Sequence, residues 1–220
     1  HRRRKAACKL HLNLNLNTYL PSFAIIEEAS HHDDQRMMAL GAHLKEGEIV
    51  VFDKAYVHFK NLFSLQERGI FWVTRAKDNI SYHVCRRRLI KRSGNIIRDD
   101  EITLKTSKSK KQYPQRLRKI EAEVEINGKL VVMTFITNNL EWAASSVCDL
   151  YRSRCGIEAF FKQLKQTLKV CDFLGNSKHA IRWQLWSALL RYVLIRYQVC
   201  VSQWPHSVVR MLTLIRGVIW

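Results

Sequence analysis

Apolar and polar residues alternate strictly near the start of the chain. The segment KLHLNLNL, residues 9–16, has a leucine at every second position, which predicts a strand with one apolar face. After a turn around residues 17–22, the segment PSFAIIE predicts a second strand, antiparallel to the first. A short helix over Asp33–Leu44, begun by Asp33 or Asp34, is expected to follow the two strands.

A longer pattern of buried strands and helices begins at residue 49. The continuous apolar run over residues 49–52 predicts a strand that is covered on both faces, and Asp53 follows it directly. A helix over Tyr56–Arg68 and a second buried strand over Ile70–Thr74 come next. This alternation predicts an α/β sheet. Because functional residues of such sheets lie beyond the carboxyl ends of strands, Asp53 is a candidate site residue.

Residues 78–138 lose the helical periodicity and are crowded with lysine and arginine. Within them, strand-like segments over Glu121–Ile126 and Lys129–Phe135 flank Asn127-Gly128, which predicts a hairpin with a type I′ turn. We therefore expect a basic, β-rich insertion subdomain at residues 78–138, set into a core made of residues 1–77 and 139–220.

Helical periodicity returns at Trp142 and continues to the end of the chain. One helix is expected to carry the segment YRSRCGIEAFFKQLK, a second to cover about Ala180–Cys200 and a third Ser207–Ile219. The apolar stretch LWSALLRYVLIRYQVCV is interrupted by Arg191 and Arg196, so we expect a packed helix there rather than a membrane span.

The charge balance changes the expectation about partners. The chain has 37 Lys and Arg against 19 Asp and Glu, a net charge of +18, and its basic residues cluster. Such a chain is expected to bind a polyanion, most commonly nucleic acid, although a role in solubility alone is the alternative. Its 6 cysteines form no CxxC pair or zinc-type grouping, and HRRRKAACK is not expected to be a signal peptide, which together predict a reduced cytoplasmic compartment.

The expected helix that contains YRSRCGIEAFFKQLK carries a regular set of polar residues. Tyr151, Arg154, Glu158 and Lys165 are spaced by three, four and seven residues, and Lys162 lies nearby. On one continuous helix the four side chains would fall within about 60° of one another. One interpretation is an ordinary amphipathic helix with an Arg154–Glu158 pair. The other is a functional stripe.

A second carboxylate favours the functional interpretation. Asp53 at a strand end and Glu158 on a helix packed against the same sheet would suit a pair of Mg²⁺ or Mn²⁺ ions about 4 Å apart, the arrangement that cleaves phosphodiesters. Arg154 and Lys165 would hold phosphates, and Tyr151 would hydrogen-bond a phosphate or stack on a base. Because two carboxylates are too few for two ions, a third is required.

The pattern Tyr-(2)-Arg-(3)-Glu-(6)-Lys resembles the signature of DDE transposases of the bacterial insertion-sequence-four group. The segments VFDKAY and FWVTRAKDN resemble the part of that family which carries its second catalytic aspartate. TNNLEW and KVCDFLG, on either side of the signature, also resemble the family, so the similarity covers nearly the whole chain.

The resemblance implies an RNase H-like core, lacking its first strand, with a β-rich insertion between the second aspartate and the glutamate. It implies that Asp53 and Glu158 are the second and third metal ligands of a two-metal Mg²⁺ or Mn²⁺ site, and that Tyr151, Arg154 and Lys165, with Lys162 nearby, contact the transposon end. The family's first aspartate lies on a strand upstream of the segment that begins this chain. A hairpin intermediate, a homodimeric synaptic complex and a bacterial, nucleoid-associated location are also implied.

The expected function is cut-and-paste DNA transposition by metal-dependent hydrolysis and strand transfer. Two alternatives stay open. The first is a catalytically dead, DNA-binding remnant of a transposase that lacks its first aspartate. The second is an RNase H-like nuclease that cleaves DNA without joining it.

Overall fold

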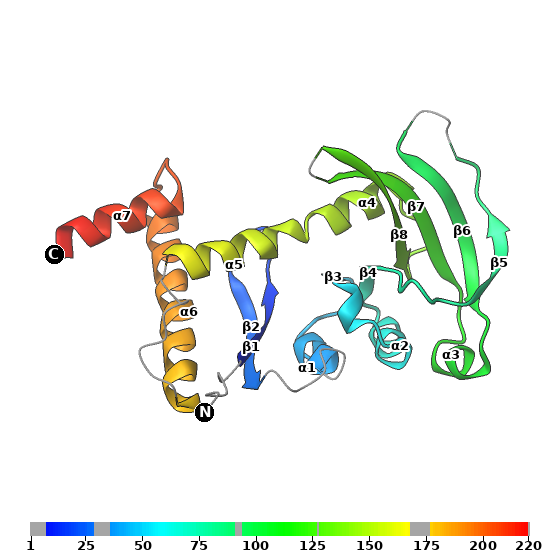
Figure 1. The fold of residues 1–220 in the computed structure, drawn as a ribbon, viewed down its shortest axis with the longest axis horizontal. Helices are drawn as coiled ribbons and strands as arrows, with labels where there is room; N and C mark the ends of the chain where they lie inside the picture. Colours follow the sequence, from blue (N-terminus) through cyan, green and yellow to red (C-terminus); the bar gives the residue numbers. More distant parts are fainter. Residues whose placement is uncertain (1–7, 29–35, 91–93, 127, 168–176, 220) are drawn as a thin grey trace, which may run out of the picture. The chain divides into compact units, whose positions relative to one another are not determined.

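The structure is a computed structural model that describes residues 8–28, 36–90, 94–126, 128–167 and 177–219. Internal contacts divide the chain into two compact units. Residues 32–154 form one, here called the sheet unit, and residues 1–31 with 155–220 form the other, here called the hairpin–helix unit. The expected helix start at Asp33 or Asp34 lies outside the described residues. Figure 1 shows the elements of both units with their labels.

A six-stranded sheet forms the body of the sheet unit, in the order β3-β4-β8-β7-β6-β5. Its strands are β3 (Ile49–Phe52), β4 (Phe71–Arg75), β5 (Tyr82–Arg87), β6 (Ile96–Leu104), β7 (Leu117–Ile126) and β8 (Lys129–Thr137). Only β3 and β4 run parallel, and the other neighbours are antiparallel. The predicted α/β class is therefore confirmed as a mixed α/β fold, but its sheet is mostly antiparallel.

The segment predicted as an insertion contributes β5–β8 to the same sheet as β3 and β4. Within it, β7 and β8 form the predicted hairpin, with Ile126 paired to Lys129 and Gly128 at φ +76°. The division into a core and a basic insertion at residues 78–138 stays a prediction.

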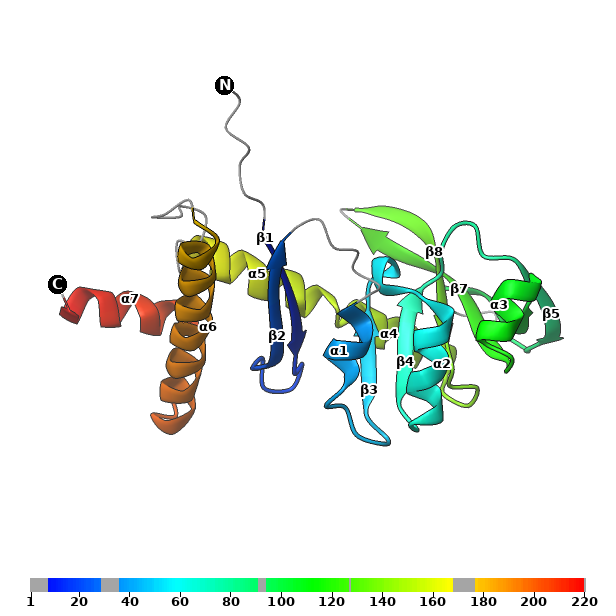
Figure 2. The ribbon, with the colours of Figure 1, turned by 90° about the horizontal axis from the view of Figure 1, so that it is seen from below.

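Helices cover both faces of this sheet. On one face α1 (Met37–Gly41), α2 (Phe59–Glu67) and α3 (Ser107–Gln112) accompany a core that includes Leu62, Trp72 and Ile102. On the other face α4 (Ala144–Arg152) packs its Val147 against Val73 and Phe135. Figure 2 shows α1 and α2 in front of β3 and β4, with α4 behind them. Successive strand residues thus face opposite cores, as the continuous apolar runs predict.

The chain between β3 and α2 differs from the sequence prediction. A single helix over Tyr56–Arg68 was expected, whereas a 3₁₀ turn, η2 (Lys54–Tyr56), precedes α2. The Asp53 carboxylate starts this turn by accepting a hydrogen bond from the Lys54 N–H. Such local capping by aspartate is a common way to turn the chain after a strand. It fixes the position of Asp53 at the carboxyl end of β3.

The hairpin–helix unit begins with the two predicted strands, β1 (Cys8–Leu14) and β2 (Pro21–Glu28). They pair antiparallel as expected, with Leu10 opposite Ile26. The alternating leucines share a face, because Leu12 is buried with Phe160 and Tyr192, and its neighbouring leucines pack on the same cluster. The helices are α5 (Cys155–Thr167), α6 (Lys178–Val201) and α7 (Val208–Ile219).

The predicted C-terminal helices are thus confirmed within two residues at each end. Across the described ranges, no helix is both long enough and apolar enough to cross a membrane.

Candidate active site

Asp53 lies where the parallel strands β3 and β4 end. Its Oδ1 accepts the Lys54 N–H at 2.6 Å, and its Oδ2 lies 3.2 Å from Nη1 of Arg154. The Asp53 side chain is 42% exposed and that of Arg154 is 23% exposed, so solvent reaches the carboxylate. A carboxylate and a guanidinium at this distance form a charge-assisted pair. The structure therefore brings together two of the residues that the sequence singled out.

Tyr151 belongs to the same group. It lies in the last turn of α4, is 7% exposed, and its ring centroid is 5.0 Å from that of Phe135. The Arg154 guanidinium lies 5.7 Å from the Tyr151 ring centroid, within the range of a cation–π contact. Burial raises the pKa of Tyr151, as does the Asp53 carboxylate, whereas Arg154 and Arg75 lower it. Tyr151 is therefore a neutral phenol at neutral pH, and its ring packs beside the Arg154 guanidinium.

Three further charged residues at this edge were not picked out from the sequence. Arg75 ends β4, and its charge acts on Tyr151. Lys54 follows Asp53 and forms an ion pair with Asp78 at 3.1 Å. The signal that could have identified them is their position, because the carboxyl ends of two parallel strands meet at one edge. The edge thus combines two carboxylates with three cations.

The continuous helix expected for the motif is not present. α4 ends at Arg152, and α5 begins at Cys155. Ser153 turns its hydroxyl back to the Leu150 carbonyl, and the Arg154 N–H bonds the Tyr151 carbonyl in a tighter turn. Such back-bonding by serine weakens a helix, and Gly156 is a poor helix former at the next turn. Tyr151 and Arg154 consequently belong to the sheet unit, and Glu158 to the hairpin–helix unit.

The remaining motif residues share a face of α5. Glu158, Lys162 and Lys165 are spaced by four and three residues and are exposed, while Phe160 and Leu164 are buried on the opposite side. The carboxylate and the two amines therefore face the same way from one rigid helix. Because Asp53 and Glu158 lie in different units, their pairing stays a prediction.

A divalent metal was expected at these carboxylates. The Asp53 oxygens are hard ligands of the type that Mg²⁺ prefers, and the side chain is accessible. Over the described part of the chain, however, no three His, Cys, Asp or Glu side chains gather closely enough to hold a metal ion. Asp53 thus fits as one ligand of such a site.

The TNNLEW segment has a structural role beside this edge. Asn138 accepts the Trp72 N–H and donates to the Ile70 carbonyl, both at 2.9 Å, so its amide continues the pairing of β8 with β4. Asn139 then accepts the N–H groups of Glu141 and Trp142 at 2.8 Å, which turns the chain toward α4. The two asparagines therefore fix the start of the helix that carries Tyr151.

Comparisons with known proteins identify the family of this chain. Residues 1–194 match the family described as "Transposase DDE domain". The chain is 30% identical over 210 residues to "Putative transposase y4zB" of Sinorhizobium fredii. The similarity covers 94% of this chain and 58% of that protein. It is 28% identical over 196 residues to "Probable transposase for insertion sequence element IS5377" of Geobacillus stearothermophilus, 88% of this chain and 50% of that protein.

A third relative is "Transposase InsG for insertion sequence element IS4" of Escherichia coli, 23% identical over 233 residues, with 95% of this chain and 51% of that protein covered. The chain belongs to the DDE transposase family, a class of DNA-cleaving enzymes, and within it to the IS4 group. It spans about half the length of the curated relatives it matches.

Proposed function

We propose that this chain is the metal-binding and DNA-binding part of a transposase that cuts and pastes an insertion sequence. The reaction would be Mg²⁺- or Mn²⁺-dependent hydrolysis at the transposon ends, followed by strand transfer. The observation that carries the proposal is the Asp53–Arg154 pair at the carboxyl end of β3, beside Tyr151. We further propose an RNase H-like core, whose remaining metal-binding aspartate lies on a strand upstream of His1, as the family pattern implies.

Each residue would have a distinct task. Asp53 and Glu158 would hold the ions, which activate the attacking water or 3′ hydroxyl and stabilise the leaving oxygen when bound. Arg154, held next to Asp53 at 3.2 Å, would bind the phosphate that approaches this carboxylate. Because the Tyr151 side chain is only 7% exposed, a hydrogen bond to phosphate suits it better than stacking on a base. Lys162 and Lys165 would hold neighbouring phosphates of the transposon end.

The test uses the longer protein that contains this chain. Asp53→Ala and Glu158→Ala are each expected to lower Mg²⁺-dependent end cleavage by at least about 10³-fold, or ~4 kcal/mol of transition-state stabilisation. Binding of the transposon end should persist, because removal of a carboxylate adds no repulsion toward phosphate. Cleavage is measured on labelled end DNA, and strand transfer with a precleaved 3′-OH end. Cleavage without strand transfer by the unaltered protein would favour the nuclease alternative.

Asp149→Ala is the matched control, because Asp149 is an exposed carboxylate on α4 that pairs with Arg152 at the surface. It should retain normal cleavage. Undiminished cleavage by either the Asp53 or the Glu158 variant would refute the metal-site assignment.

A non-catalytic, DNA-binding remnant is the second candidate. In this candidate the basic charge of the chain would serve DNA binding alone. Sequencing the DNA upstream of the His1 codon separates the two candidates. An in-frame aspartate on a preceding strand supports the enzyme, whereas a stop codon or frameshift supports the remnant.

A homodimer is part of the same proposal. One face of α6 exposes a row of large apolar side chains at helical spacing: Trp183, Trp186, Leu190, Leu194, Tyr197 and Val201. The opposite face of α6 packs within the unit, where Leu185, Leu189 and Tyr192 are buried. Leu190 and Leu194 also line an apolar groove of about 740 Å³ between α6 and α7. Six exposed side chains of this size present on the order of 700 Å², close to one side of a standard interface.

A second copy is the occupant that best fits this face. The row repeats every three or four residues over most of a 24-residue helix, the spacing of a helix–helix seam. A two-fold axis would place the same row on both partners, so the interface would be self-complementary.

A further inference from the structure

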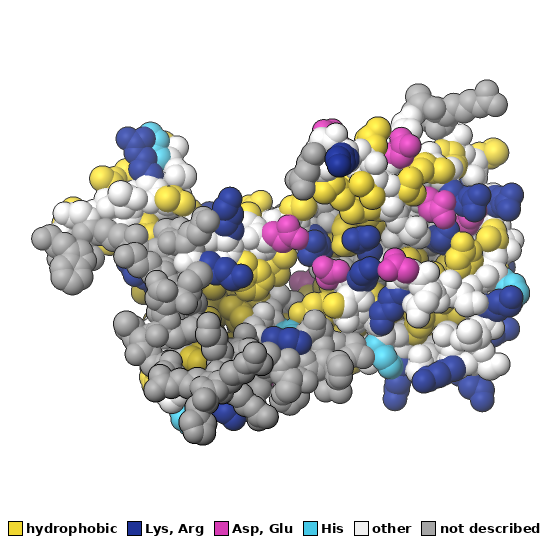
Figure 3. Space-filling view, viewed as in Figure 1, with side chains coloured by type: hydrophobic (Ala, Val, Ile, Leu, Met, Phe, Trp, Pro, Cys, Tyr) yellow, Lys and Arg dark blue, Asp and Glu magenta, His cyan; other side chains and the backbone are white. Residues whose placement is uncertain are grey.

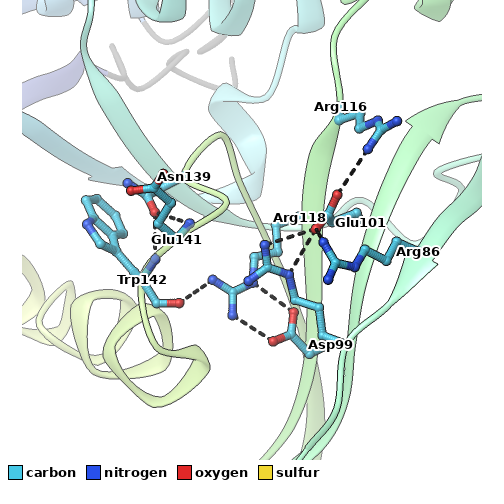
Figure 4. A network of polar contacts seen from close by, with 9 residues as sticks. Arg86, Asp99, Glu101, Arg116, Arg118, Asn139, Glu141 and Trp142 are labelled. Atoms are coloured by element: carbon cyan, nitrogen blue, oxygen red, sulfur yellow. Dashed lines mark hydrogen bonds and ion pairs between the residues drawn. The ribbon is translucent and has the colours of Figure 1, made fainter.

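A buried carboxylate on β6 gathers three arginines. Glu101 is 5% exposed, and its Oε1 accepts hydrogen bonds from Nε and Nη2 of Arg88 at 3.2 and 3.0 Å. Arg116 donates to Oε2 at 3.4 Å, and Nη1 of Arg86 lies 3.8 Å from Oε1. Arg86, Arg88 and Arg116, centred on Glu101, are called the arginine cluster below. Figure 4 shows Arg86, from β5, and Arg116, from the residue just before β7, approaching Glu101.

The cluster carries an excess of positive charge. Three guanidinium groups and one carboxylate leave a net charge of +2. The neighbouring pair of Arg118 and Asp99 is neutral and bidentate, with contacts of 2.8 and 2.6 Å, so it offers no compensation. Arg88 alone already donates two hydrogen bonds to Oε1 of Glu101. Arg86 and Arg116 are 70% and 59% exposed, so most of their donors remain accessible to a ligand.

The cluster lies on the same sheet face as α4. Glu101 and Arg118 are opposite each other in the β6–β7 ladder and share a face, and Arg118 donates to the Trp142 carbonyl just before α4 begins. At the other end of α4, Arg154 pairs with Asp53. In the sheet order β6 lies four strand spacings from β3, about 19 Å, or roughly six base-pair steps of duplex DNA. Figure 3 shows further Lys and Arg side chains over the β5 side of this unit.

We infer that the arginine cluster is a binding site for the phosphate backbone of duplex DNA, on the same sheet face as α4 and four strand spacings across the sheet from β3, where Asp53 lies. Glu101 would act as the organiser, because it holds the guanidinium groups in place before DNA arrives and so lowers the entropy cost of binding. Arginine suits this role because its planar fork can engage a phosphate in bidentate fashion. The inference rests on the proposed function in one respect, namely that the chain binds DNA.

The test measures the salt dependence of binding by the full 220-residue chain. Each lost phosphate contact lowers the magnitude of the slope of log K against log salt by about 0.9. The double variant Arg86→Gln/Arg116→Gln is therefore expected to lower the slope by about 2 and to weaken binding roughly tenfold at moderate salt. A duplex of unrelated sequence should show the same loss, because phosphate contacts carry no sequence information.

Lys108→Gln/Lys110→Gln is the matched control. It also removes two exposed positive charges, but on α3, which accompanies the opposite face of the sheet. Its slope should change by less than about 1. Arg86→Lys/Arg116→Lys should keep the unaltered slope with weaker affinity, because the charge stays and the fork is lost. Arg86→Gln alone, which leaves the hydrogen bonds of Glu101 to Arg88 and Arg116 in place, should lower the slope by about 1.

Several outcomes would overturn the inference. They are an unchanged slope in the Arg86 and Arg116 variants, equal losses in the arginine and lysine pairs, and a loss confined to one DNA sequence. Failure of the unaltered chain to bind any duplex would overturn the proposed function as well. Failure of the cluster alone would leave the Asp53 site untouched, since that site is tested by cleavage.

Discussion

Asp99 and Arg118 form an ion pair inside the sheet unit, where their side chains are 8% and 3% exposed. Replacing one partner leaves the other charge buried without compensation, which costs more than the pair contributes. Asp99→Asn is therefore expected to lower the free energy of unfolding by about 3–5 kcal/mol. Urea denaturation followed by circular dichroism measures this loss.

The control for this experiment is Asp149→Asn. Asp149 and Arg152 form a similar pair at 3.3 Å, but both side chains are more than 60% exposed. Exposed pairs contribute about 0–1 kcal/mol, so the control should unfold almost like the unaltered protein. Equal losses in the two variants would mean that burial does not set the strength of the Asp99–Arg118 pair.

Single residues also show what the sequence could and could not supply. Asp53 was predicted from its place after an apolar strand, and it lies there. Its contact with Arg154 could not be predicted, because it depends on how α4 crosses the sheet. The arginine cluster was equally hidden. Arg86 and Arg88 come from β5 and its end, and Arg116 from just before β7, and they meet at Glu101 of β6 only through the ladder pairing.

At the scale of elements, the end of α2 depends on one glycine. Gly69 has φ +69°, the Ile70 N–H bonds the Leu65 carbonyl, and a Cβ at residue 69 would lie 2.6 Å from Cγ of Glu46. Gly69→Ala is expected to lower the free energy of unfolding by about 1–2 kcal/mol, through left-handed backbone strain and this contact. Thermal or urea unfolding measures the change.

The opposite sign is expected for Gly217→Ala. Gly217 lies inside α7 with nothing near the position of an added Cβ, so alanine should stabilise by about 0.5–1 kcal/mol through helix propensity. If both variants shifted stability in the same direction, backbone conformation would not be the cause.

Elements with regular periodicity were predicted well, and irregular ones were not. The β1–β2 and β7–β8 pairs, the two buried strands and the C-terminal helices all follow clear patterns. β5 and β6 were not predicted as individual strands, because register shifts at Val84/Arg86 and Ile96/Arg98 interrupt the alternation of apolar and polar residues. The break between α4 and α5 was not predicted, because the helical spacing of the motif continues across it. The break itself is favoured by the Ser153 hydroxyl, which hydrogen-bonds the Leu150 carbonyl of the preceding turn.

At the scale of the whole molecule, the exposed row on α6 leads to a prediction about assembly. Leu190→Glu/Leu194→Glu places two charges at its centre and is expected to convert a dimer into a monomer, with a loss of affinity of at least 100-fold. Sedimentation velocity at micromolar concentration measures the state, and circular dichroism checks that helix content is retained.

Leu130→Glu is the comparison for this experiment, because Leu130 is a 71% exposed leucine on β8, in the sheet unit. It should leave the oligomeric state unchanged. A dimer that survives the α6 double variant, or one that is lost equally in the Leu130 variant, would exclude the α6 row as the interface.

The arginine cluster also has a consequence for folding. Without a bound anion the sheet unit must fold while three like charges converge on one carboxylate. The repulsion between these charges lowers the stability of the folded unit. Any polyanion that binds only the folded form relieves that repulsion and shifts the folding equilibrium toward the folded form. DNA would then also be a folding ligand of this protein, and multivalent buffer anions such as phosphate or sulfate would partly replace it.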